Sequence, residues 1–254
     1  MLILKAKELK KVYSGNSPTS STVALNHVNL EIEEGSFTSI MGPSGSGKTT
    51  LLNVLSGLSQ PSSGSVTIKN LDIFHLKQDE LAHFRRRYLG FIFQDYNLLD
   101  GLTVIENIML PKILENADVV DMKEKAQYLT KIFSITEIED RFPHQLSGGQ
   151  KQRCAIARAM MNDTSIIFAD EPTGNLDSKS SKAVMRAFVK ANTDKKAAIL
   201  MVTHDPYTAS YGNRVIFIKD GKIETELYRK ESQKEFFNQI MNNLAVLEVD
   251  NSDF

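Results

Sequence analysis

One short stretch limits the possible folds more than any other: GPSGSGKTT, residues 42–50. It matches the pattern G-x-x-x-x-G-K-[ST] and follows directly on FTSIM at 37–41, which has the pattern of a buried strand. A helical pattern begins near Lys48. In that context the glycines let successive backbone N–H groups converge on phosphate oxygens. The sequence therefore predicts an α/β domain with a strand–loop–helix unit that binds nucleotide phosphates.

The side chains of this loop define the expected ligand further. Lys48 places a positive charge near the β- and γ-phosphates, and the Thr49 hydroxyl can bind Mg²⁺. The positive end of the following helix faces the anion. A flexible glycine–serine turn, the alternative, does not account for the strand, the Lys–Thr pair and the helix together. The candidate phosphate-binding residues are Gly42, Pro43, Ser44, Gly45, Ser46, Gly47, Lys48, Thr49 and Thr50.

Two further strands are expected at SIIFA (165–169) and AAILMV (197–202). Continuous apolar runs of this length are typical of parallel strands covered on both faces. Polar residues follow each run, Asp170–Glu171 in one case and Thr203–His204–Asp205 in the other. Ligands of open α/β sheets bind at the carboxyl ends of the strands, so we expect these residues to meet at one ligand. Asp170 suits a Mg²⁺ contact and Glu171 a general base, although the pair could instead cap the next turn.

A second glycine loop lies far downstream, in LSGGQKQR at 146–153. Ser147 and Gln150 have the spacing of a capping box, so a helix is expected to start here. A helix N-terminus preceded by glycine backbone is an anion site. One nucleotide cannot be wrapped twice from the same side. We therefore predict that Ser147, Gly148, Gly149 and Gln150 bind the nucleotide held by another copy, in a head-to-tail dimer around two ATP molecules.

The order of the motifs resembles that of ATP-binding cassette (ABC) transporter ATPases. GPSGSGKTT, FIFQDYNLL, LSGGQKQR, IIFADEPTG, NLD and VTHD follow one another as they do in that family, and the resemblance covers Met1 to about Ile223. It implies an α/β P-loop NTPase cassette with a RecA-like core, an antiparallel β subdomain and a helical subdomain at roughly 95–160. Residues 224–254 are then a helical C-terminal extension.

The resemblance also implies roles for individual residues. Tyr13 would stack on adenine, unless it is a partly buried strand tyrosine. Gln94 would contact Mg²⁺ and the attacking water and sense the membrane partner, which makes Thr49, Gln94 and Asp170 the metal set. Glu171 would be the base, and His204 would contact the γ-phosphate. Asp177 would reach across the dimer. Asn175, in GNLD, departs from the Ser–Ala pair of many relatives and could alter the cross-dimer contact.

The segment 72–111 resembles one transporter branch more closely. That branch includes macrolide exporters, lipoprotein-releasing systems and antimicrobial-peptide resistance transporters, and the chain is most similar to bacitracin- and lantibiotic-resistance ATPases. The resemblance implies ATP and Mg²⁺ as cofactors, a transmembrane permease, a second copy and a membrane sensor kinase as partners, and the cytoplasmic face of a bacterial membrane as location. The alternatives are a macrolide or lipoprotein motor, a soluble cassette ATPase and a P-loop kinase.

Composition argues against nucleic acid as a partner. The net charge is −1, so the chain as a whole does not attract a polyanion. Arg85, Arg86 and Arg87 are expected to form a solvated or docking face on a short helix. The single cysteine, Cys154, stands among small apolar residues and is expected to be a buried, inert thiol.

Four smaller expectations concern the rest of the chain. Asp220–Gly221 is expected to turn a hairpin in VIFIKDGKI. Residues 16–22 are expected to form a polar loop, and 248–254 to fray. A last helix is expected to dock on its own domain rather than on a partner, with one apolar face made of Phe236, Phe237, Ile240, Met241, Leu244 and Leu247.

Overall fold

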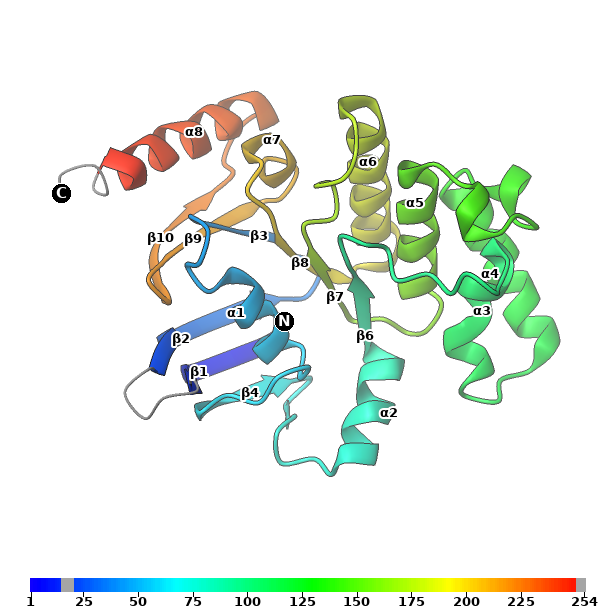
Figure 1. Cartoon of the computed structure of the whole chain (residues 1–254), viewed down its shortest axis with the longest axis horizontal. Coiled ribbons are helices and arrows are strands. Elements are labelled where there is room, and N and C mark those ends of the chain that lie inside the picture. The colour runs from blue at the N-terminus through cyan, green and yellow to red at the C-terminus, as the bar shows by residue number, and fades with distance from the viewer. Residues whose placement is uncertain (15–20, 250–254) are drawn as a thin grey trace.

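The computed structural model describes residues 1–14 and 21–249, and these form two β-sheets with helices packed on them (Figure 1). The predicted α/β class is confirmed. Most of the predicted polar loop and the frayed terminus lie outside the described residues, but Ser21 and Thr22 already belong to a strand. The strands are β1 (Leu2–Ser14), β2 (Ser21–Glu33), β3 (Phe37–Met41), β4 (Ser63–Ile68), β5 (Leu71–Asp72), β6 (Leu89–Ile92), β7 (Ile166–Asp170), β8 (Ala198–Val202), β9 (Arg214–Lys219) and β10 (Lys222–Tyr228).

A six-stranded sheet in the order β10-β9-β3-β8-β7-β6 forms the centre of the molecule, and a four-stranded antiparallel sheet in the order β2-β1-β4-β5 lies beside it. All neighbours in the larger sheet are parallel except β9 and β10. The helices are α1 (Lys48–Leu55), α2 (Gln78–Tyr88), α3 (Val104–Ile113), α4 (Val119–Ile132), α5 (Gly148–Ala159), α6 (Ser178–Lys195), α7 (Pro206–Ala209) and α8 (Gln233–Val249), with 3-10 turns at Thr136–Ile138 and Pro143–Gln145.

The apolar runs at β7 and β8 are continuous because both faces of the large sheet are buried. Along β7, Ile166 and Phe168 pack into the core shared with the small sheet and α1, whereas Ile167 and Ala169 pack into the core shared with α3–α6. Successive side chains of a strand point to opposite faces, so each face needs its own apolar partner. The two predicted parallel strands are confirmed.

Helices lie at both ends of the molecule, beyond the central sheet. Helices α3, α4 and α5 gather at one end (green in Figure 1), and α8 lies at the other (red). Helix α1 packs between the two sheets. Among the residues that the structure describes, no helix is both long and apolar enough to cross a membrane.

The hairpin predicted at Asp220–Gly221 is confirmed. Both residues have positive φ, 50° and 73°, and join β9 to β10. The turn also supports the phosphate loop, because the Gly221 N–H donates to the carbonyl oxygen of Ser46 at 3.0 Å. The Asn26 N–H on β2 in turn donates to the Gly221 carbonyl at 2.9 Å. Two sheets therefore hold the loop from behind.

The last helix docks on its own domain, as expected. On α8, Phe236 is 1% exposed and Ile240 fully buried, and both pack against Met41 and Phe217 of the large sheet. The prediction is wrong for Met241, which is 44% exposed, because the contact stripe is narrower than the apolar pattern. The side chain of Leu247 lies outside the described part.

Truncating Phe236 should loosen α8. Phe236→Ala removes a fully buried ring, so we expect the free energy of unfolding to fall by about 3–5 kcal/mol. Met241→Ala, on the exposed side of the same helix, should change it by no more than about 0.5 kcal/mol. Urea unfolding of both variants, with amide exchange followed in α8, measures the difference. Equal effects of the two substitutions would contradict the docked geometry.

The arginine prediction on α2 needs correction. Arg85 donates to the carbonyl of Gly57 at 2.7 Å, and Arg86 donates to that of Leu114 at 2.9 Å. Both side chains are half-buried, and only Arg87 is exposed. The first two therefore tie loops together rather than forming a solvated face. The Cys154 prediction holds: the side chain is fully buried, and burial raises the pKa of its thiol to about 12.

Candidate nucleotide-binding site

The phosphate loop lies between β3 and α1, as predicted. Gly42 and Gly47 have φ of 152° and 100°. A Cβ on Gly42 would overlap the carbonyl oxygen of Ile218, and one on Gly47 would overlap that of Ala24. Only glycine fits at these two points, because the left-handed backbone and the close approach of β2 and β9 both exclude a side chain. The fold thus imposes the curvature that a phosphate-binding loop requires.

Two polar groups in the loop are arranged for an anion. The Lys48 ammonium donates to the carbonyls of Gly42 and Pro43 at 2.9 and 2.8 Å. Burial lowers the pKa of Lys48, while Glu171 and Asp170 oppose that shift. The Ser46 hydroxyl is buried and has no hydrogen-bond partner within the described part of the chain. An unpaired buried hydroxyl is costly, and a phosphate oxygen would satisfy it. The loop therefore fits a phosphate group.

The structure brings together polar residues from three strand ends. The Thr49 hydroxyl, after β3, donates to the Asp170 carboxylate at the end of β7 at 3.4 Å. Glu171 follows with φ 44°, and its Oε1 lies 3.0 Å from Nδ1 of His204, which follows β8. The Glu171 side chain is 18% exposed and that of His204 72%. Strand β8 lies between β3 and β7, so adjacency in the sheet produces this cluster.

The donor set suits a magnesium ion. Mg²⁺ in proteins is bound by one or two carboxylates together with substrate phosphates. Burial raises the pKa of Asp170, the Thr49 hydrogen bond and Lys48 oppose that rise, and Glu171 adds to it. A half-buried carboxylate beside a hydroxyl, next to a phosphate loop, would be stabilised in its charged form by a cation. Thr49 and Asp170 therefore fit the ion.

Gln94, the third predicted metal residue, reaches the same region from the loop after β6. Its Nε2 donates to Oδ1 of Asn175 at 3.2 Å. A Cβ built on Gly174 would lie 3.2 Å from that Nε2 and 3.4 Å from the carbonyl oxygen of Glu171. The Gln94 amide therefore lies over the backbone that follows Glu171.

The second glycine loop starts α5 as predicted. The Ser147 hydroxyl accepts from the Gln150 N–H at 3.4 Å, and the Gln150 side chain accepts from the Ser147 N–H at 2.9 Å. Gly148 is closely approached by two side chains: a Cβ there would lie 2.7 Å from the Tyr96 hydroxyl and 2.8 Å from a Leu176 methyl group, so both side chains would have to shift. The predicted capping box is confirmed.

Within one chain the two glycine loops are apart. Figure 1 shows α5 well away from α1, with β7 and β8 between them. No hydrogen bond or ion pair joins residues 147–150 to residues 42–50 in the described structure. One chain therefore presents the two loops to different places.

The two remaining predicted residues lie at the periphery. Tyr13, near the end of β1, is 45% exposed, with the Lys11 ammonium 5.0 Å from its ring centroid. Its ring has free surface for stacking on a base, and it is also a strand residue with more than half of its surface covered, so the adenine role of Tyr13 stays a prediction beside its alternative. Asp177 caps α6: it accepts from the N–H groups of Lys179 and Ser180 at 2.8 and 3.0 Å and from the Ser180 hydroxyl at 2.7 Å. The Ser180 hydrogen bonds are the main cause of its lowered pKa.

Sequence reasoning gave no role to Tyr96, and it gave Asn175 only a departure from a common motif. Both join the loop after β6 to other motifs. Arg158 on α5 donates to the carbonyls of Tyr96 and Asn97 at 3.0 and 2.5 Å. One signal in the sequence could have drawn attention to Tyr96: it lies two residues after Gln94. The hydrogen bonds from Arg158 join residues far apart in the chain, so no local pattern reveals them.

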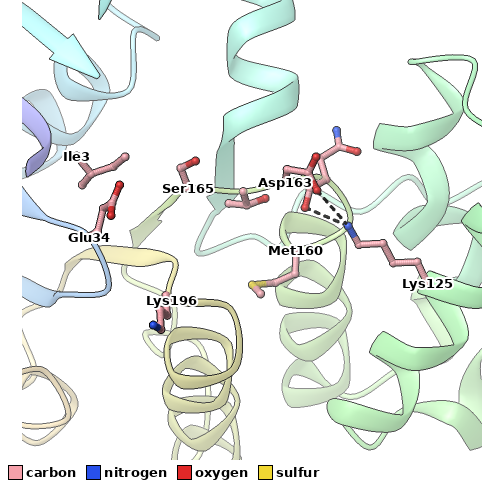
Figure 2. Close-up of a pocket in the computed structure, with 9 residues that line it drawn as sticks. Ile3, Glu34, Lys125, Met160, Asp163, Ser165 and Lys196 are labelled. Atoms are coloured by element: carbon pink, nitrogen blue, oxygen red, sulfur yellow. Dashed lines mark hydrogen bonds and ion pairs between the residues drawn. The ribbon is translucent and has the colours of Figure 1, made fainter. Parts of the chain in front are cut away.

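Two hollows lie at opposite ends of strands β7 and β8. One, of about 430 Å³, lies beside Glu171 and His204 and is lined also by Lys182 and Tyr207. The other, of about 370 Å³ and shown in Figure 2, lies where β7 and β8 begin, at the opposite end of the strands. Ser165 and Lys196 line it, beside the Lys125–Asp163 ion pair of 3.9 Å. The hollow of Figure 2 is therefore separate from the cluster at the carboxyl ends.

Comparison with known proteins gives consistent matches. Residues 25–174 match the family model described as "ABC transporter". The chain is 49% identical over 245 residues to the ABC transporter ATP-binding protein YxdL of Bacillus subtilis, covering 96% of this chain and 94% of the relative. It is 48% identical over 248 residues to the bacitracin export ATP-binding protein BceA of Halalkalibacterium halodurans, covering 97% of each.

A solved structure matches as well. The ATP-binding cassette MJ0796 of Methanocaldococcus jannaschii, a dimer in a post-hydrolysis state bound to ADP and Pi, superposes with a TM-score of 0.81 at 40% identity. The match covers 91% of this chain and all of that one. The likeness therefore extends from sequence motifs to the whole cassette fold.

Proposed function

This chain belongs to the ATP-binding proteins of the ABC transporter family and is an ATPase, and we propose that two copies close head to tail around two ATP molecules to drive a membrane permease. Each nucleotide then lies between the phosphate loop of one copy and residues 147–150 of the other. Tyr13 stacks on adenine, and Asp177 contacts the opposite copy. The chain thereby works at the cytoplasmic face of a bacterial membrane without crossing it.

The observation that carries this proposal is the separation of the two anion-binding loops. Residues 42–50 form a loop that fits a phosphate, and residues 147–150 present a capped helix start elsewhere on the chain. In a dimer with a twofold axis, residues 42–50 of each copy can face residues 147–150 of the other copy, because the axis makes the two contacts equivalent. The similar cassette MJ0796 is itself dimeric in its solved structure.

The chemistry follows from the cluster at the strand ends. Water attacks the γ-phosphorus, a new O–P bond forms, and the bond to the β–γ bridging oxygen breaks, which leaves ADP and phosphate. The Glu171 carboxylate accepts the water proton. His204, 3.0 Å from Glu171, contacts the γ-phosphate and holds that carboxylate in place. Thr49, Gln94 and Asp170 would hold Mg²⁺, which would neutralise charge on the phosphates when bound. Lys48 shifts from its carbonyl partners to the phosphate oxygens.

Dilution tests the shared site. We expect ATP turnover per chain to fall as the chain concentration is lowered through the dissociation constant of the dimer, because a monomer lacks half of each site. Turnover is measured over a concentration series, with sedimentation run in parallel at each concentration. Full turnover per chain by material that sediments as a monomer would rule the proposal out.

The cargo of the transporter is proposed to be an antimicrobial peptide of the bacitracin or lantibiotic type. The 48% identity to BceA along 97% of both chains supports this choice over a macrolide or lipoprotein system. The transmembrane permease is the obligatory partner, and a membrane sensor kinase is a further one. Nucleic acid has no part in this proposal.

Drug susceptibility tests the cargo. Deleting the gene from its host should lower the concentration of bacitracin or a lantibiotic that stops growth, while that of a macrolide stays unchanged. Affinity purification of the tagged chain from membranes should recover the permease, and the kinase if it is part of the complex. A change for the macrolide alone would favour the alternative transporter type.

A further inference from the structure

We propose that Asn175 is a positioning residue: it fixes the orientation of the Gln94 carboxamide so that the oxygen, and not the NH₂ group, faces Mg²⁺ and the nucleotide. The inference rests on the metal-binding role proposed above for Gln94. The position of Gln94 alone does not decide whether its amide presents the oxygen or the NH₂ group to the metal, and the contact with Asn175 does.

Three hydrogen bonds connect the loop after β6 to the loop after β7. The Gln94 Nε2 donates to Asn175 Oδ1 at 3.2 Å. The Asn175 Nδ2 donates to the carbonyl oxygen of Gln94 at 3.5 Å and to the carboxylate of Asp95 at 3.4 Å. The two loops are 81 residues apart in sequence, and adjacent strands bring them together.

The direction of both amides follows from what each partner can do. A carbonyl oxygen and an ionised carboxylate only accept hydrogen bonds, so the Asn175 group that faces Gln94 O and Asp95 must be its NH₂. Its Oδ1 then faces the Gln94 side chain and can only accept. The Gln94 NH₂ is therefore the donor in that contact, and its Oε1 remains for a cation. Partners one step removed from a metal commonly orient the ligand in this way.

Neighbouring contacts fix the backbone on both sides of this link. Arg158 holds the carbonyls of Tyr96 and Asn97, and Tyr96 has φ 65°. On the other side, Asp177 caps α6 two residues after Asn175. With the backbone held, Gln94 can still rotate about its side-chain torsions. Within the described part of the chain, Asn175 is the side chain that hydrogen-bonds the Gln94 amide and so restricts this rotation.

Removing Asn175 should therefore weaken metal binding more than nucleotide binding. For Asn175→Ala we expect the Mn²⁺ affinity of the ADP-loaded protein, measured by electron paramagnetic resonance, to fall by about 10–100-fold. The Mg²⁺ concentration for half-maximal ATP turnover should rise by the same factor. Metal-free binding of a fluorescent ATP analogue and the melting temperature should stay unchanged. Asn238→Ala, at an exposed asparagine on α8, is the matched control.

A charge swap separates orientation from mere packing. Asn175→Asp keeps an acceptor but loses its donors and places a carboxylate against Asp95, so the repulsion should move it away from the Gln94 amide and lower the metal affinity. Adding Asp95→Asn supplies an amide donor to the new carboxylate, so the double variant should regain most of the lost affinity. If Asn175 only held the two loops together, the melting temperature would fall and recover together with the metal affinity.

Gln94→Ala provides the benchmark for the outcome. If Gln94→Ala weakens Mn²⁺ binding and Asn175→Ala does not, the positioning role is overturned while the metal role of Gln94 stands. If neither variant weakens Mn²⁺ binding, the metal role of Gln94 falls and takes this inference with it. ATP turnover that still depends on Glu171 would then leave the rest of the proposed function intact.

Discussion

Replacing Glu171 with glutamine is expected to lower ATP turnover by about 10²–10⁴-fold, the usual contribution of a general base. Glutamine keeps the shape and the hydrogen bond toward His204 but cannot take the proton of the attacking water. ATP binding should survive, since Lys48 and the glycine loop are untouched. Phosphate release under saturating ATP measures turnover, and equilibrium binding of a fluorescent analogue measures affinity.

The same variant should accumulate as an ATP-bound dimer. In the proposed dimer, hydrolysis removes the γ-phosphate that joins the two copies, so a chain that binds ATP but does not hydrolyse it should stay closed. Size-exclusion chromatography with and without ATP shows the change. Glu137→Gln, at an exposed carboxylate outside the strand-end cluster, should behave as wild type. Wild-type turnover by Glu171→Gln would show that the base lies elsewhere.

The second large effect is expected at Ser147. Its side chain is exposed at the start of α5, where the proposed dimer places the γ-phosphate of the other copy. Ser147→Arg puts a long side chain into that space, so ATP-driven dimerisation and turnover should be lost. ATP affinity of the monomer should remain, because the Ser147 loop is apart from the phosphate loop in the same chain.

The helix cap at Ser147 needs its own control. Losing the cap costs about 0.5–2 kcal/mol of stability by itself. Ser147→Ala loses the cap without adding bulk, so it should lower the melting temperature yet still dimerise with ATP. Loss of ATP affinity in the Ser147→Arg monomer would contradict a site shared between two chains.

Mixing two inactive variants gives the sharpest form of this test. Lys48→Ala disables the phosphate loop, and Ser147→Arg disables the opposing loop. In a mixed dimer one of the two sites combines an intact Lys48 with an intact Ser147. The introduced arginine then faces only the phosphate loop of the Lys48→Ala copy, which holds no ATP, so turnover should appear on mixing, although each variant alone is inactive. No recovery in a mixture shown to contain mixed dimers would mean that one intact site is not sufficient.

Local patterns determined much of this protein. The apolar runs at 165–169 and 197–202 specify buried parallel strands because any polar residue inside them would be stranded between two cores. The capping box at Ser147 and the turn at Asp220–Gly221 are short motifs whose backbone geometry depends on adjacent residues. The glycine loop at 42–50 is also recognisable from its local pattern, although β2 and β9 hold it in shape. Ligands of open α/β sheets bind at the carboxyl ends of the strands, so the meeting of Thr49, Asp170 and His204 could also be expected.

Only the tertiary structure decided which long-range partners each side chain would find. Arg85 and Arg86 were expected on a solvated face, but the loops that they hold are 28 residues away in sequence, and Met241 lies outside a contact stripe whose width depends on the sheet beneath it. The link from Asp95 through Asn175 to Gln94 has the same origin. Hydrogen-bond direction and packing depend on distances across the fold, and those distances exist only once the strands have assembled.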